Sequence, residues 1–123
     1  MARNLDLQIK DTVFEPGSQQ KIVYYWPESN TTLYKVWILL DGIDLPYVDS
    51  VTYRLHSTFS DPNRRVKRTV ANQNCQLIIW TWGLFRIRAR VVDKTGRIHE
   101  FVHDMRYAEE ISLPEAKFQK EKP

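Results

Sequence analysis

Val51-Thr-Tyr-Arg-Leu-His-Ser-Thr-Phe59 and Trp80-Thr-Trp-Gly-Leu-Phe85 are the two stretches of sequence that decide the fold. In the first stretch apolar and polar side chains alternate, which predicts a β-strand with one buried face. Residues 61–63, Asp-Pro-Asn, then favour a turn. In the second stretch a glycine interrupts an apolar run, which indicates a bulge or a close approach of the backbone. Each stretch therefore places an aromatic side chain, Phe59 or Trp82, at a break beside the end of a strand.

The same alternation recurs along the rest of the chain, interrupted by turn-forming Gly, Pro, Asp and Asn residues. We predict strands at Leu5–Lys10, Lys21–Trp26, Leu33–Leu40, Val48–His56, Arg65–Val70, Gln76–Trp80, Leu84–Val92 and Arg97–Asp104. No segment has the spacing of a convincing amphipathic helix. Seven or eight short strands without helices predict an all-β protein, an immunoglobulin-like antiparallel β-sandwich.

Length and composition indicate one domain, because 123 residues suffice for a single hydrophobic core. We expect a β-sandwich over residues 1–108 and a charged tail or linker over residues 109–123. The one cysteine, Cys75, excludes an internal disulfide and fits a reducing compartment, so we expect a cytoplasmic protein. No apolar run approaches the ~18 residues that a membrane span needs. The net charge of +3 permits an acidic partner but argues against strong nucleic-acid binding.

The residues that could carry catalysis or bind a metal are poorly placed for either task. His56, Ser57 and Thr58 are adjacent, but neighbouring strand side chains point to opposite faces, and no acid is placed to orient the histidine. His99 and His103 share a strand face about 13 Å apart, too far for one zinc ion. We therefore predict no catalytic residues, no metal site and no cofactor.

Basic residues alternate with apolar ones near the end of the second stretch. Arg86, Arg88 and Arg90 are predicted to form a row on one face of the sheet, which could attract phosphate or an acidic peptide. A solvated outer face, partly paired with Asp and Glu on neighbouring strands, is the simpler interpretation of the same pattern.

Two motifs in the sequence resemble the signatures of the YEATS domain family. Leu55-His-Ser-Thr-Phe59, followed by Pro62 and Arg64, is similar to the family signature LHxTF..P.R. Thr81-Trp-Gly-Leu-Phe85 is similar to the family signature GWGEF. The resemblance covers roughly residues 34–105, and the two motifs in this order are far more specific than either alone. The short chain and the strand after the second motif are more similar to the prokaryotic members.

The resemblance implies a ligand and a role for each motif residue. In eukaryotic YEATS domains the two motif loops form an aromatic channel around the planar amide of an acylated lysine. Phe59 and Trp82 would then be the stacking walls, and the Thr58 hydroxyl would bond to the acyl amide. The backbone at Trp82-Gly83 would donate to the acyl oxygen, and His56 would support its loop. Acylation would be the selective switch, because an unmodified lysine must lose the hydration of its ammonium group.

Two positions depart from the family pattern. Eukaryotic members have a further aromatic residue in the loop before the third strand, where only Tyr34 is a nearby candidate here. Leu84 replaces the acidic residue of the second motif. With Tyr34, and with Ser57 from the first motif, the expected binding residues are His56, Ser57, Thr58, Phe59, Trp82, Gly83 and Tyr34.

Three classes of function remain open at this point. The first is a non-enzymatic recognition module whose Phe59/Trp82 cleft binds a small planar group, by analogy an acylated lysine on a protein or peptide. The second is a scaffolding or adaptor domain of a prokaryotic signalling or defence assembly, docking through a sheet edge or through the arginine row. The third, an enzyme, is the weakest, because no pairing of a nucleophile with a base is visible in the sequence.

Overall fold

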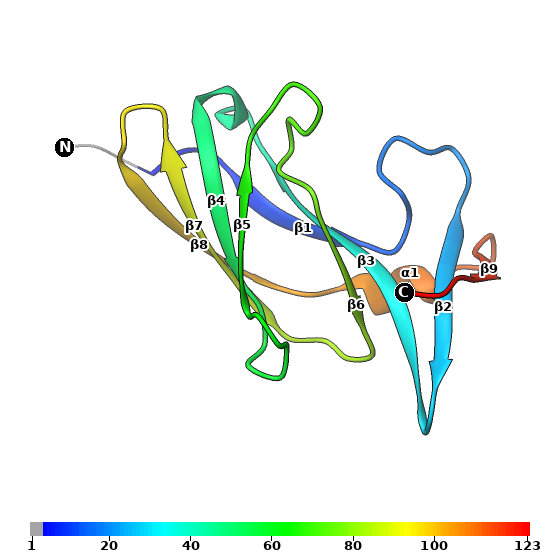
Figure 1. Ribbon diagram of the computed structural model, residues 1–123. Helices are drawn as coiled ribbons and strands as arrows, with labels where there is room; N and C mark the ends of the chain where they lie inside the picture. The colour runs from blue at the N-terminus through cyan, green and yellow to red at the C-terminus, as the bar shows by residue number, and fades with distance from the viewer. Residues whose placement is uncertain (1–3) are drawn as a thin grey trace.

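A computed structural model describes residues 4–123 and shows two β-sheets packed face to face (Figure 1). Sheet A contains β1, β3, β2 and β9 in that order, and β6 pairs with β3 as well. Sheet B contains β5, β4, β7 and β8 in that order. Within the described residues the strands are β1 (Gln8–Thr12), β2 (Ile22–Glu28), β3 (Thr31–Asp41), β4 (Val48–Arg54), β5 (Asn63–Lys67), β6 (Leu77–Thr81), β7 (Arg86–Asp93), β8 (Ile98–Asp104) and β9 (Lys117–Lys120).

This arrangement confirms the prediction of an all-β, immunoglobulin-like sandwich. Within each sheet the pairs are antiparallel, with the exception of β2 and β9. Side chains along β7 alternate as expected: Ile87, Ala89 and Val91 are buried, and the three arginines between them are exposed. The period of two in the sequence therefore assigns the buried face of β7 correctly.

The core lies between the two sheets and is mainly aliphatic, with Val36, Ile38 and Leu40 from β3 at its centre. Tyr53 is fully buried on β4, and its hydroxyl donates a hydrogen bond to the backbone carbonyl of Cys75 at 2.7 Å. This bond satisfies the polar end of a large side chain that otherwise contributes apolar area to the core. Burial raises the pKa of the Cys75 thiol to about 11, so the side chain behaves as a small neutral hydrophobe.

Gly42, in the turn after β3, packs closely against the backbone of the segment before β1. Its φ is +142°, and a Cβ added there would lie 2.3 Å from the backbone oxygen of Asp6. Nearby, the Asp44 side chain accepts a hydrogen bond from the backbone N–H of Asp6 at 2.6 Å. Only glycine combines this backbone conformation with so close an approach of another segment.

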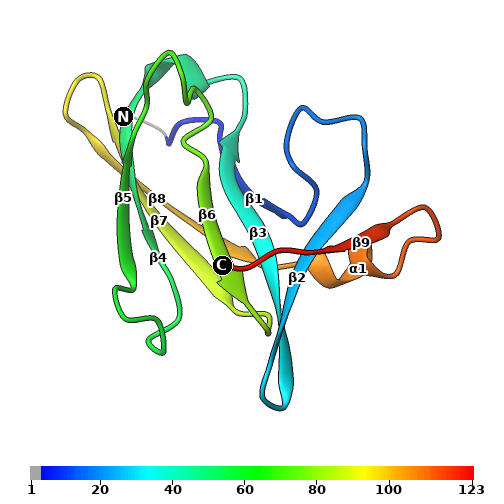
Figure 2. The same cartoon turned by 45° about the vertical axis from the view of Figure 1, so that its right-hand side comes forward.

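The segment after β8, which includes the residues expected to form a charged tail or linker, contains regular secondary structure. It forms a short helix, α1 (Tyr107–Ile111), and then the strand β9, which runs parallel to β2 (Figure 2). Side-chain contacts also stabilise the packing of β9. Lys35 forms an ion pair with Glu121, just after the strand, at 2.9 Å, and the Lys120 ammonium lies 5.2 Å from the centre of the Trp26 ring. Docking of β9 is the reason that the described strands exceed the seven or eight predicted. The domain boundary at residue 108 stays a prediction.

Candidate functional site

The two motif loops lie at the same end of the sandwich, the end that also carries the tip of the β2–β3 hairpin (Figures 1 and 2). The first loop joins β4 to β5 and is compact, because the backbone N–H of Leu55 donates to the carbonyl of Pro62 at 2.7 Å. Inside the loop, the N–H of Phe59 donates to the carbonyl of His56 at 3.1 Å, which closes a β-turn. The turn places the Phe59 ring at the lip of the sandwich, half-buried.

His56 organises this turn through its ring nitrogen Nδ1. The backbone N–H of Thr58 lies 3.3 Å from that nitrogen, and the Thr58 hydroxyl lies 2.9 Å from it. An N–H donor requires an unprotonated acceptor, so the imidazole is the tautomer protonated at Nε2, and the hydroxyl also donates to Nδ1. The lone pairs of the exposed Thr58 oxygen are then left to accept a hydrogen bond from outside the protein.

Phe85 joins the two motif loops. Its ring centre lies 5.6 Å from that of Phe59 and 6.2 Å from that of His56, both in tilted arrangements. Phe85 belongs to the second motif and packs on the core, so it fixes the first loop against the start of β7. The sequence does not predict this contact, because the adjacency of the two loops is a property of the fold.

Trp82 lies at the tip of the second loop, between β6 and β7, and 69% of its surface is exposed. Within residues 4–123 its ring has no aromatic neighbour, and the ring neighbour of Phe59 on the second motif is Phe85. Next to Trp82, a Cβ added at Gly83 would meet nothing within 4 Å. Gly83 is therefore not a point of close backbone approach, and its bare backbone borders open space.

Tyr107, at the start of α1, forms a hydrogen bond with the second loop. Its hydroxyl donates to the Gly83 carbonyl at 2.9 Å, whereas the Thr81 hydroxyl makes only long contacts of 3.4 Å with the same glycine. The Tyr34 ring packs against Tyr107, with 6.2 Å between ring centres, and Tyr34 is also the strand partner of Thr81. Burial, with a smaller effect of Tyr34, raises the pKa of Tyr107 to about 12, which keeps its hydroxyl a hydrogen-bond donor.

Asp11 in turn positions Tyr107. Its side chain accepts hydrogen bonds from the backbone N–H groups of Arg106 and Tyr107, which satisfies the open N–H groups at the start of α1. The same carboxylate pairs with the ring of His103. A residue on β1 thus caps a helix about a hundred positions later, and the helix holds the loop of the second motif.

The structure places the predicted binding residues in two groups. His56, Ser57, Thr58 and Phe59 share the first loop, and Trp82, Gly83 and Tyr34 surround the second. Phe85, Tyr107 and Asp11 connect or support the groups and are absent from the prediction. The only sequence signal for any of them is the position of Phe85 inside a motif. Whether the Phe59 and Trp82 rings wall one slot stays a prediction.

The arginine row is partly paired, as the simpler interpretation of the sequence predicts. Arg86 forms an ion pair with Asp104 at 2.9 Å, and Arg90 with Glu100 at 3.4 Å, both across β7 and β8. The structure records no carboxylate partner for Arg88 among residues 4–123.

The remaining histidines both pair with aspartates. His99 is buried and lies 2.8 Å from Asp93, and His103 pairs with Asp11. Within the described part of the chain, no group of three or more His, Cys, Asp or Glu side chains could hold a metal ion. No helix among the described residues has the length and apolar character needed to cross a membrane.

Comparison with known proteins gives a family and a fold. The Yaf9 YEATS domain recognizing an H3K122suc peptide matches with a TM-score of 0.57 and 20% identity, over 89% of this chain and 80% of that chain. The yeast AF-9 homolog protein Yaf9 matches with a TM-score of 0.57 and 18% identity, over 85% of this chain and 68% of that chain. No curated protein gave a significant match. A family model for the prokaryotic YEATS domain matches residues 34–106, which is more than half of the sequence. The chain therefore belongs to the prokaryotic YEATS domain family.

Proposed function

We propose that this protein is a non-enzymatic recognition module that binds an acylated lysine of a protein or peptide between its two motif loops. The family assignment and the similarity to a YEATS domain described as recognizing an H3K122suc peptide support this proposal. The observation that carries it is the joining of the two loops by Phe85, which packs against both His56 and Phe59 at the lip of the sandwich.

The aromatic contacts come from two rings that differ in exposure and in their neighbours. Phe59 is held by its turn and by Phe85, which lowers the entropic cost of positioning its ring when a ligand binds. Trp82 is exposed and lacks a ring neighbour among residues 4–123, so its face is open for stacking on the flat acyl amide. In this proposal Trp82 closes over the ligand while Phe59 forms the fixed wall.

Polar groups on both motif loops can form hydrogen bonds with the N–H and the oxygen of the acyl amide. The Thr58 hydroxyl donates a hydrogen bond to His56 Nδ1, and its oxygen can accept a hydrogen bond from the amide N–H of the ligand. The Gly83 N–H makes only a long hydrogen bond of 3.4 Å to the Thr81 hydroxyl, and it can donate to the acyl oxygen instead. An ammonium group in the same position would lose its hydration between the two rings, which disfavours an unmodified lysine. Acylation therefore decides which lysine binds.

The test is a calorimetric titration of the full chain with one short peptide in four forms, carrying acetyl-, crotonyl-, succinyl- or unmodified lysine. At least one acylated form should bind, with the unmodified form weaker by at least about tenfold, which corresponds to ~1.4 kcal/mol. Phe59→Ala and Trp82→Ala should each remove the preference, while circular dichroism shows an intact fold.

A matched control for the loss of an exposed aromatic ring is Phe118→Ala, because Phe118 lies on β9 and not on either motif loop. Binding that survives in both Phe59→Ala and Trp82→Ala, or that falls equally in Phe118→Ala, would contradict the proposed site. Equal affinity for acylated and unmodified lysine would contradict the proposed ligand.

A further inference from the structure

We infer that the outer face of sheet B carries a second binding site, an arginine clamp formed by Arg54 and Arg88, and that it takes a carboxylate side chain of an acidic peptide segment from a partner protein. The two arginines are direct partners in the register of β4 and β7. Like charges directly opposite each other on antiparallel strands are destabilising, so this placement costs stability unless an anion joins them.

The two arginines that flank Arg88 along β7 are both compensated by acids on β8. Along β7, Arg86 faces Asp104 on β8, and Arg90 faces Glu100, and both pairs form ion pairs. At the middle position Arg88 faces Val102, which is 54% exposed and cannot compensate a charge. Of the three arginines on β7, only Arg88 therefore has no acidic residue opposite it on β8. Arg88 is also the arginine that lies opposite Arg54 on β4.

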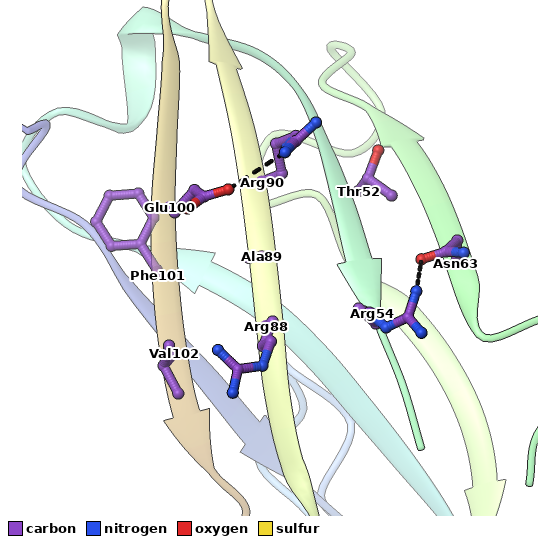
Figure 3. Close-up of a pocket in the computed structure, with 9 residues that line it drawn as sticks. All are labelled: Thr52, Arg54, Asn63, Arg88, Ala89, Arg90, Glu100, Phe101 and Val102. Atoms are coloured by element: carbon purple, nitrogen blue, oxygen red, sulfur yellow. Dashed lines mark hydrogen bonds and ion pairs between the residues drawn. The ribbon is translucent and has the colours of Figure 1, made fainter. Parts of the chain in front are cut away.

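Arg54 lacks a carboxylate partner among the described residues as well. Among residues 4–123 its side chain has one recorded hydrogen bond, which it donates to the amide oxygen of Asn63 on β5 at 3.3 Å. In Figure 3 the two guanidinium groups turn away from each other, Arg54 toward Asn63 and Arg88 toward Val102. This is the arrangement expected of two like charges with no anion between them.

The space for a ligand is a groove of about 510 Å³ that both arginines line (Figure 3). Its other lining side chains include Thr52 and Asn63, which can form hydrogen bonds, and Val102, which offers an apolar contact. Glu100 lines the groove too, and its carboxylate is already paired with Arg90. Guanidinium groups bind carboxylates through two parallel hydrogen bonds, so the pair can hold one carboxylate from both sides. A mixed cationic and apolar groove suits a peptide segment that presents an acidic and an apolar side chain.

A nucleic acid fits this face less well than a peptide. Glu100 and Asp104 lie on β8 on either side of the Val102 position, and a continuous phosphate backbone would meet both carboxylates. A single carboxylate can bind at Arg88 without approaching Glu100 and Asp104 as a longer chain of phosphates would. The net charge of +3 is also too small to provide the broad positive field typical of nucleic-acid binding.

The experiment measures the fluorescence anisotropy of a labelled peptide in which Glu and Val alternate over about eight residues, so that the Glu side chains share one face of an extended chain. Comparison probes are the same peptide with Gln in place of Glu, inorganic phosphate as a competitor, and a short labelled DNA duplex. The Glu peptide should bind at least about tenfold more tightly than the Gln peptide and more tightly than the duplex. Equal binding of the two peptides, tighter binding of the duplex, or no binding of the Glu peptide would overturn the inference.

Substitutions locate the site. Arg54→Gln and Arg88→Gln should each weaken binding of the Glu peptide about tenfold. Lys67→Gln removes the same charge from an exposed position of β5 and should leave binding within about twofold. An equal loss in Lys67→Gln would show a general effect of charge and would contradict a specific clamp.

A further pair of variants supplies the missing acid within the chain. Val102→Glu places a carboxylate opposite Arg88, as Asp104 and Glu100 are placed opposite their arginines, and should abolish peptide binding while raising the melting temperature. Ile98→Glu adds the same charge on the same strand at a residue that is 53% exposed and faces Val92, and should do neither. If both variants lost binding equally, the clamp would be excluded. The Glu peptide carries no lysine, so this result is independent of the proposed acyl-lysine site.

Discussion

The Tyr107 hydroxyl donates a hydrogen bond to the Gly83 carbonyl at 2.9 Å and thereby joins the helix after β8 to the loop of the second motif. The residues are 24 positions apart, and Tyr107 is almost fully buried. The bond matters for function because Gly83 follows the exposed Trp82 directly. This hydrogen bond to Gly83 restrains the backbone of the loop that carries Trp82, while the Trp82 ring stays open to solvent.

Tyr107→Phe should lower the free energy of unfolding by about 0.5–1.5 kcal/mol, because the Gly83 carbonyl loses its one short hydrogen bond from a side chain. Urea denaturation measures the change. Tyr24→Phe is the matched control, since the Tyr24 hydroxyl makes no recorded side-chain hydrogen bond within residues 4–123, and it should change stability by less than about 0.5 kcal/mol. Equal costs for the two variants would show that the Tyr107 bond contributes nothing specific.

Gly83→Ala should separate binding from folding. The added methyl group meets open space and the backbone needs no glycine-specific conformation there, so stability should stay equal or rise by up to about 1 kcal/mol. The same methyl group would cover the backbone that we propose donates to the acyl oxygen, so affinity for the acylated peptide should fall about tenfold. Unchanged affinity in a stable Gly83→Ala protein would place the ligand elsewhere.

Gly42→Ala should give the opposite result. The new methyl group would overlap the Asp6 carbonyl oxygen in a backbone conformation that favours glycine, so stability should fall by about 2 kcal/mol or more. Thermal unfolding measures the loss, and Gly17→Ala provides a comparison at a glycine of positive φ with open space around it. Gly17→Ala should cost less, because only the backbone conformation is strained there. A Gly42→Ala protein as stable as the original would mean that the turn rearranges freely.

Stability should fall in acid partly through Asp93. Hydrogen bonds from Thr95 and His99 hold the pKa of Asp93 well below its usual value of 3.8. Because the folded-state pKa is lowered, the stabilisation from this carboxylate is complete above pH 3.8 and is lost as the pH falls below that value. Asp93→Asn should therefore show a shallower loss of stability than the original protein over that acid range.

Asp61→Asn is the control for that comparison, since Asp61 is an exposed aspartate whose side chain has no recorded hydrogen bond or ion pair among residues 4–123. Its acid profile should follow that of the original protein. Urea denaturation across the acid range checks both variants, and identical profiles for Asp93→Asn and the original protein would remove Asp93 from the explanation.

Strand positions and their buried faces could be predicted from the sequence because they depend on local alternation. The run Arg86–Val91 shows this, since its apolar members are buried and its arginines are exposed. The turn after the first motif strand could also be predicted, because the turn-forming residues 61–63 follow the motif directly. These features need no knowledge of which strands become neighbours. The end of that strand is predicted too late: the sequence predicts a strand to His56, whereas β4 ends at Arg54 and His56 belongs to the loop.

The supports of the site could not be predicted, because they depend on contacts between distant segments. Asp11 caps α1 from β1, and Phe85 meets Phe59 only because the two loops share an end of the sandwich. The strand β9 has the sequence Lys-Phe-Gln-Lys, which is too short and polar to predict a strand, and it pairs because β2 offers an open edge.

The most direct test of the acyl-lysine proposal is an NMR experiment on the full chain with the acylated peptide that binds most tightly in the calorimetric titration. We predict nuclear Overhauser effects from the protons of the acyl group to both the Phe59 ring and the Trp82 indole, with an upfield shift of the acyl signals from the two ring currents. Contacts from the acyl protons to neither ring, or chemical-shift changes confined to Arg54, Arg88 and their groove, would contradict the proposal.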